Sequence, residues 1–257
     1  MSPCCGAKIG RVDVERLVDQ LEADGPRLAT AADRATLDAP VEHCPGWTVR
    51  DLVLHIGGVH RWAARIVREQ LSADPTPAVD DLERPPADTD PVEWFRAGHA
   101  ALVETLRAAP DGLAAFTFLP APSPLHFWTR RQAHETAIHR ADAELAAGGP
   151  VTAFPTDFAK DGIDELLFGF AARRYRPRDR TVTIGLRADD GPSWSAELGG
   201  EQILVEPLPE TGWTNVMISG SSSELYLWLW NRPSVAQLRG DRDAAAQWGD
   251  TVRVRWS

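Results

Sequence analysis

Apolar residues recur every three or four positions through the first half of the chain, which is the period of an amphipathic helix. The pattern predicts a first helix from Val14, with a break allowed at Gly25-Pro26, because proline cannot donate an interior helical hydrogen bond. A second helix is predicted after Trp47, where Thr48 and Asp51 form a capping-box signature and Trp47 is placed to act as a hydrophobic staple. Its buried stripe is Leu52, Ile56, Val59, Ala63 and Ile66.

Two further helices are predicted before residue 150. The third begins at Asp90-Pro91, after a connection rich in proline and aspartate, and Glu93 completes a second capping pattern. A proline-rich loop follows. The fourth helix begins near Ser123-Pro124 and ends at Gly148-Gly149. Four helices with two long connections predict a four-helix bundle.

After Pro150 the pattern changes to short runs rich in β-branched and aromatic residues, several of which alternate apolar and polar positions. These runs predict strands, and helical segments lie between them. The strand runs are RTVTIGLRA, SWSAELG, QILVEPL, TNVMIS and TVRVRW, and the helical segments are 157–174, SSSELYLWLWNR and DRDAAAQW. We therefore expect the fold class to be α+β, with a helical bundle in residues 1–150 and a smaller mixed α/β domain in residues 151–257.

Composition and charge narrow the class of partner. The formal net charge of -10 argues against nucleic-acid binding, because phosphate contacts need a basic face. No apolar run approaches the roughly 20 residues that cross a bilayer, and the N-terminus has no apolar segment typical of a secretory signal. We therefore expect a cytoplasmic protein. Cys4 and Cys5 are adjacent near the N-terminus and Cys44 stands alone, so no disulfide framework is indicated.

The fourth predicted helix carries many ionisable residues among its apolar ones, in the stretch RRQAHETAIHRADAE. Glu135 and His139 are four residues apart, so they share one face with residues that must be buried. The pair is equally consistent with a structural ion pair and with two metal ligands. His134 is five residues from His139 and lies about 140° round the helix, so we interpret it as a surface or boundary histidine.

A third ligand must come from another helix, and His55 is the best candidate because it lies on the buried stripe of the second helix. A lone histidine there is more often a hydrogen-bonded core residue. All three residues together favour a metal. Two histidines and one glutamate leave an open position, as in catalytic zinc sites, although iron, nickel or manganese would also accept this set. Asp142, three residues after His139, could orient that imidazole or be an ordinary helix acid.

The stretches CPGWTVRDLVLHIGG and HETAIHRAD, together with SGSSSELYLWLWNR near the C-terminus, resemble the mycothiol-dependent maleylpyruvate isomerase family. The resemblance covers nearly the whole chain. It implies a DinB-like metal-binding bundle followed by a sterol-carrier-protein-like domain. The implied metal ligands are His55, Glu135 and His139, and Arg232 matches an arginine that the family uses near its active site.

The resemblance also implies mycothiol, a small thiol of actinobacteria, as cosubstrate. Three hypotheses follow. The first is a divalent-metal enzyme, with zinc as the favoured ion, which uses mycothiol to isomerise a small electrophile or to transfer the thiol to it. The second is a metal-dependent hydrolase on the same bundle. The third is a non-catalytic metal- or ligand-binding regulatory protein. Neither the electrophile nor the oligomeric state follows from the sequence, and a monomer is the default expectation.

Overall fold

The computed structural model describes residues 12–75, 83–171, 173, 175, 179–209 and 212–252. They form two compact units, one containing Asp13–Thr152 and the other containing Ala153 onward. The α+β fold class predicted from the sequence is confirmed, because a helical first part is followed by a part with a mixed sheet. Cys4 and Cys5 lie outside the described residues.

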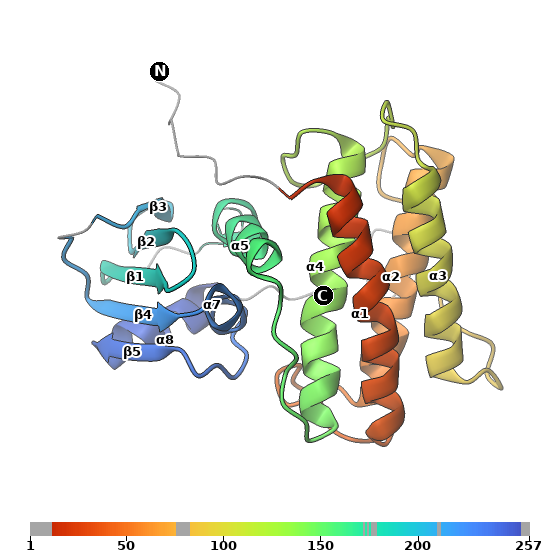
Figure 1. Ribbon diagram of the computed structural model, residues 1–257, viewed down its shortest axis with the longest axis horizontal. Coiled ribbons are helices and arrows are strands. Elements are labelled where there is room, and N and C mark those ends of the chain that lie inside the picture. Colours follow the sequence, from red (N-terminus) through yellow and green to blue (C-terminus); the bar gives the residue numbers. More distant parts are fainter. Residues whose placement is uncertain are drawn as a thin grey trace. The chain divides into compact units, whose positions relative to one another are not determined.

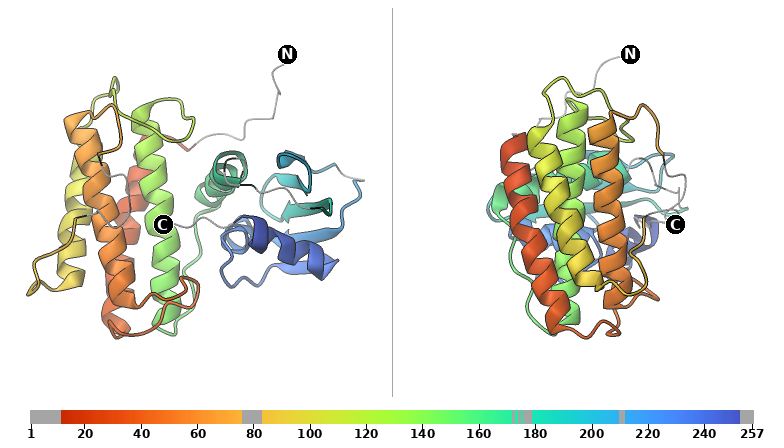
Figure 2. Two further views of the ribbon diagram at one scale, coloured as in Figure 1. Left: turned by 180° about the vertical axis from the view of Figure 1, so that it is seen from behind. Right: turned by 90° about the vertical axis from the view of Figure 1, so that its right-hand side faces the viewer.

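The first unit is a bundle of four helices that lie alongside one another (Figures 1 and 2). They are α1 (Val14–Arg34), α2 (Val49–Glu69), α3 (Pro91–Ala108) and α4 (Pro124–Ala146). Helix α1 packs mainly against α4, and α2 packs mainly against α3. Both side-chain hydrogen bonds of the predicted capping box between Thr48 and Asp51 are present at the start of α2.

The break allowed at Gly25-Pro26 does not occur, because α1 continues through both residues. Pro26 is exposed, so water can satisfy the carbonyl oxygen that would have accepted its missing amide hydrogen. Gly25 has no Cβ to clash with the proline ring, which relieves the usual restriction on the residue before a proline. Gly25 is also packed so closely that a Cβ there would lie 2.3 Å from the His99 ring.

The core of the bundle at the α2 N-terminus joins all four helices and the loop between α1 and α2. Trp47, at the end of that loop, packs against this core from the side of α2 where His55 lies. The buried members of the core are Leu28, Ala29, Ala31, Ala32, Val41, Val49, Leu52, Val53, Ile56, Val92, Phe95 and Ala143. Burial of these side chains therefore fixes the loop and the first turns of α2 against α4.

The second unit contains a five-stranded sheet in the order β3-β2-β1-β4-β5, in which β1 and β4 are parallel and the other neighbours are antiparallel. Alternate residues of β1, β2 and β4 are buried on one face, and α7 and α8 pack against β1 and β4. The strands are β1 (Val182–Ala188), β2 (Ser193–Leu198), β3 (Leu204–Pro207), β4 (Val216–Gly220) and β5 (Gln237–Gly240), and the helices are α5 (Thr156–Asp164), η2 (Glu165–Ala171), α7 (Ser222–Leu229) and α8 (Arg242–Thr251).

Four of the five predicted strand runs are strands. The fifth, TVRVRW, is not one where it is described, because Thr251 ends helix α8, and residues 253–256 lie outside the described residues. Strand β5 had no corresponding prediction. All four of its residues are exposed at the edge of the sheet, so it lacks the buried alternation from which the other strands were predicted.

Candidate metal centre

Helix α4 is buried almost throughout its length, on all of its faces. Because no face of α4 is left to solvent, its apolar residues are not confined to one stripe. Its N-terminus is fixed by Ser123, whose side chain accepts a hydrogen bond from the backbone amide of His126. Glu135 and His139 lie one turn apart on this helix, and the two residues are 3% and 6% exposed. Charged groups with so little access to water need partners within the protein or a bound ion.

The structure brings His55 of α2 to the two residues of α4. His55 Nε2 lies 3.6 Å from Glu135 Oε1, and His139 Nε2 lies 3.4 Å from the same oxygen. One ligand atom from each of the three residues falls within 4.8 Å of the other two. The three residues singled out from the sequence therefore form one cluster, which contains two nitrogen donors and one oxygen donor.

These separations fit a bound ion better than direct hydrogen bonds. A good N–H···O bond spans about 2.7–3.2 Å. Buried His55 Nε2 and Glu135 Oε1 have no hydrogen-bond partner within the described residues. Ligands about 2.0–2.1 Å from a tetrahedral ion lie about 3.3–3.5 Å from one another, close to the separations found here. The donor set and its spacing therefore suit a divalent ion, with a position left for another ligand.

The charge of the cluster depends on the protonation of its two histidines. Burial lowers the pKa of His55, with only a partial offset from Glu135, so this imidazole is neutral near pH 7. Burial alone would raise the pKa of Glu135, but the neighbouring imidazoles of His139 and His55 and the charge of Arg131 outweigh it and hold the pKa well below the usual value. Burial opposes charging of His139, yet its hydrogen bond to Asp142 and the proximity of Cys44 and the Glu135 carboxylate outweigh it and raise its pKa well above the usual value. Without an ion, a proton on His139 therefore compensates the carboxylates.

Arg131 is a member of the site that the sequence did not single out. Its Nη2 donates to Glu135 Oε2 at 3.0 Å, and the arginine side chain is 1% exposed. Because Arg131 holds Oε2, the other oxygen of Glu135 is the one that faces the two histidines. The i,i+4 spacing of Arg131 and Glu135 was a signal that could have found this contact.

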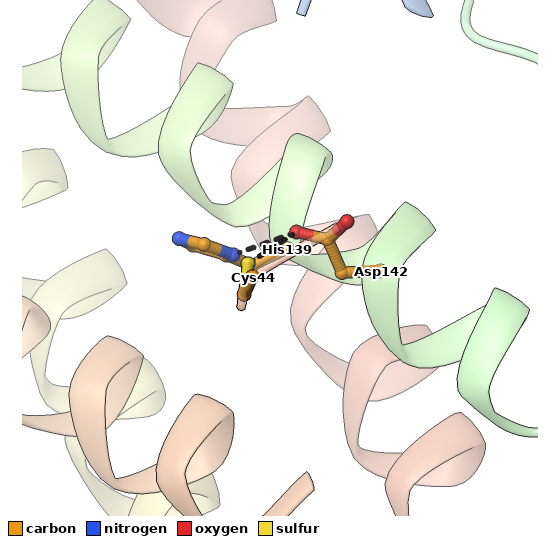
Figure 3. A group of neighbouring side chains, drawn as sticks. All are labelled: Cys44, His139 and Asp142. Atoms are coloured by element: carbon orange, nitrogen blue, oxygen red, sulfur yellow. Dashed lines mark hydrogen bonds and ion pairs between the residues drawn. The ribbon is translucent and has the colours of Figure 1, made fainter. Parts of the chain in front are cut away.

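Behind His139, away from Glu135, lies a second group of side chains (Figure 3). His139 Nδ1 donates to Asp142 Oδ2 at 3.0 Å, which is the contact expected of an orienting carboxylate. Cys44, in the loop before α2, donates its thiol hydrogen to the same oxygen with Sγ 3.6 Å away. The indole of Trp47 lies over the histidines, with ring centroids 4.8 Å from His55 and 6.0 Å from His139.

The other histidines of the bundle do not join the cluster. His134 is fully buried, so its interpretation as a surface or boundary histidine was wrong; helical spacing gives its direction on α4 but not what covers that face. His60 is also fully buried, and its Nε2 lies 2.8 Å from Thr136 Oγ1. His99 Nε2 lies 2.9 Å from the carbonyl oxygen of Leu21. Some buried histidines of this bundle, such as His60 and His99, are therefore hydrogen-bonded core residues, whereas His55 and His139 are candidate ligands.

Arg232 belongs to the second unit, just after the end of α7. Its backbone amide donates to the carbonyl oxygen of Leu227, and its Nη1 donates to that of Trp230 at 2.7 Å. Asn231 before it has a left-handed backbone conformation, with φ of 58°, which turns the chain out of the helix. A role for Arg232 in catalysis stays a prediction.

Among the described residues, no helix is both long enough and apolar enough to span a membrane. The fold and the site together define a protein with a four-helix bundle, a candidate metal centre inside that bundle, and a second α+β unit. Two family models match this chain: the mycothiol maleylpyruvate isomerase N-terminal domain over residues 18–144, and the corresponding C-terminal domain over residues 157–254. The chain therefore belongs to the mycothiol maleylpyruvate isomerase family.

Solved structures agree on the fold. A crystal structure of the mycothiol-dependent maleylpyruvate isomerase superposes with a TM-score of 0.62 at 13% identity, covering 90% of this chain and 95% of that one. A histidine-to-alanine mutant of the same enzyme gives a TM-score of 0.60 at 14% identity, with the same coverage. A search of curated protein sequences gave no match.

Proposed function

We propose that this chain is a divalent-metal enzyme that uses mycothiol as a cosubstrate and acts on a small electrophile, as an isomerase or a thiol S-transferase. The observation that carries the proposal is the cluster of His55, Glu135 and His139, in which a buried nitrogen of each histidine lies 3.4–3.6 Å from Glu135 Oε1. Membership of the mycothiol maleylpyruvate isomerase family supports the choice of thiol and of reaction class.

His55, Glu135 and His139 are the proposed ligands, and zinc is the proposed ion because two imidazoles and a carboxylate with one open position are typical of catalytic zinc. An ion held there would lower the pKa of a thiol that reaches the open position, so that its sulfur is a thiolate near neutral pH. Arg131 keeps one oxygen of Glu135 engaged, which leaves the other for the ion.

The protein around the cluster would restrict the access of bulk water to it. The indole of Trp47 covers the rings of His55 and His139 on one side. The ligand residues are themselves 3–6% exposed, so little of the site is open to bulk solvent. A site with restricted access to water limits competing hydrolysis of a reactive substrate.

For the isomerase, the thiolate would add to an activated cis double bond of the substrate. The resulting single bond rotates, and elimination of the thiol gives the trans product. For the S-transferase, the same sulfur would displace a leaving group. Arg232 is the residue proposed to hold a substrate carboxylate, because a guanidinium can bind both carboxylate oxygens at once.

The test is turnover by the zinc-loaded protein with and without mycothiol, using maleylpyruvate first and then other small cis-unsaturated acids. We expect product only when both metal and mycothiol are present. The matched variants are His139→Ala and His99→Ala, each of which removes a buried imidazole from the bundle. Only His139 belongs to the cluster, so His99→Ala is the control. His139→Ala should abolish turnover and His99→Ala should retain it. Turnover without thiol would instead favour a hydrolase, and bound metal with no reaction of any thiol and electrophile would favour a regulatory protein.

A further inference from the structure

Asp142 is a buried carboxylate that the coordination of a metal does not by itself require. Its side chain is almost without access to water, and its Oδ2 accepts hydrogen bonds from His139 Nδ1 at 3.0 Å and from Cys44 Sγ at 3.6 Å (Figure 3). The N–H and the S–H therefore converge on one oxygen atom. Burying a carboxylate costs free energy unless hydrogen-bond donors replace its lost water, and His139 and Cys44 supply those donors here.

The arrangement determines which nitrogen of His139 is available to a metal. A proton held on Nδ1 by Asp142 leaves the lone pair of a neutral imidazole on Nε2. Nε2 is the nitrogen that lies 3.4 Å from Glu135 Oε1, inside the candidate cluster. The contact with Asp142 also limits rotation of the ring, which would otherwise carry Nε2 away from Glu135.

The geometry does not suit a cysteine nucleophile. In a Cys-His-Asp triad, the thiol and the carboxylate lie on opposite nitrogens of the imidazole. Here Cys44 donates to the same carboxylate oxygen that accepts from His139 Nδ1. Cys44 is therefore better placed as a hydrogen-bond donor than as a reactive group.

Cys44 also connects Asp142 to the loop that carries Trp47. The backbone amide of Cys44 donates to the carbonyl oxygen of Val41 at 3.0 Å, and the amide of Trp47 donates to that of Cys44 at 2.9 Å. These turns place the thiol against Asp142 and the indole over His55 and His139. One short loop thus contacts both the ligands and the carboxylate behind them.

We propose that Asp142 and Cys44 are positioning residues for His139: Asp142 fixes the ring so that Nε2 faces the metal, and Cys44 fixes Asp142. This role rests on the proposed metal centre. Because it acts through His139, loss of Asp142 weakens metal binding without removing a ligand. Outer partners of metal-bound histidines typically contribute about 10–100-fold in metal affinity.

The experiment is measurement of the zinc Kd by chelator competition at pH 8 for the parent, Asp142→Ala, Asp142→Asn, Cys44→Ala and Cys44→Ser, with the cobalt absorption spectrum of each. Asp142→Ala should raise the Kd about 10–100-fold. Asp142→Asn should restore much of the loss, because its amide oxygen can still accept from Nδ1. Cys44→Ala should have a smaller effect than Asp142→Ala, and Cys44→Ser should lie closer to the parent because a hydroxyl also donates.

Thermal melting of the metal-free variants separates positioning from general stability. A purely structural Asp142 would lower the Tm of metal-free protein and leave the Kd unchanged, and that result would overturn the proposal. An unchanged Kd and cobalt spectrum in Asp142→Ala would do the same while leaving the metal centre intact. Absence of zinc binding in the parent would overturn the metal centre itself, and this role with it.

Discussion

Metal binding to this cluster should depend on pH through one proton. Near pH 7, His55 is neutral because burial lowers its pKa, and Glu135 is ionised because its pKa is held well below the usual value. His139 is the exception. Although burial opposes its charged form, its hydrogen bond to Asp142 and the proximity of Cys44 and the Glu135 carboxylate raise its pKa well above the usual value, so it is protonated in the metal-free protein. An incoming ion must displace that proton.

The size of the change in zinc Kd with pH follows from the number of protons that the ion displaces. Between pH 6.5 and 7.5 one proton is released per ion bound, so the apparent Kd should rise about tenfold for each unit by which pH falls, or about 1.4 kcal/mol per unit. At lower pH the protonation of His55 adds a second proton and steepens the dependence. At pH above the raised pKa of His139 the dependence disappears, because the imidazole is already neutral.

The assay is the zinc Kd at several pH values, with the chelator's own proton competition subtracted, beside direct measurement of proton release on adding zinc. His99→Ala is the control, since His99 lies outside the cluster and its substitution should leave the slope unchanged. A Kd that does not vary between pH 6.5 and 7.5, or zinc binding without proton release, would refute the protonated state assigned to His139.

Two further predictions concern packing and the cover of the site. Gly25→Ala should lower the free energy of unfolding in urea by at least about 1 kcal/mol, because the new Cβ would lie 2.3 Å from the His99 ring. Gly112→Ala is the control and should be close to neutral, because nothing lies within 4 Å of a Cβ at that position. Equal stabilities of the two variants would contradict this packing. Cobalt or copper ions should quench tryptophan emission, and Trp47→Phe should reduce that quenching, because this indole lies 4.8 Å from His55. Unchanged quenching in Trp47→Phe would contradict the assigned position of the indole.

Much of the bundle could be predicted because local signals and burial agree there. The capping pair Thr48/Asp51 forms both hydrogen bonds that its spacing predicts. The i,i+4 spacing of Glu135 and His139 requires that they share a helical face wherever α4 packs. The apolar stripe of α2 indicated that His55 points into the bundle, where α4 also packs against α2. The helical period and the burial of apolar residues are therefore enough to predict that these three side chains point into the bundle.

The remaining contacts of the site depend on tertiary packing that no local pattern encodes. Cys44 stands alone in the sequence, yet the loop places it against Asp142, which lies 98 positions further along the chain. His134 is buried although its direction on α4 predicted a boundary position, because a helix that is covered on all sides has no exposed face. In the same way, the sequence Gly25-Pro26 predicts a break in α1, but packing of the bundle keeps the helix continuous there.

The most direct test of the metal centre is elemental analysis of the purified protein, incubated with zinc and desalted, beside His139→Ala and His99→Ala treated identically. We predict close to one zinc per chain in the parent and in His99→Ala, and a large loss in His139→Ala. Metal-free parent protein, or equal metal in the parent and His139→Ala, would contradict a centre built from His55, Glu135 and His139 and would leave these residues as a buried charge cluster.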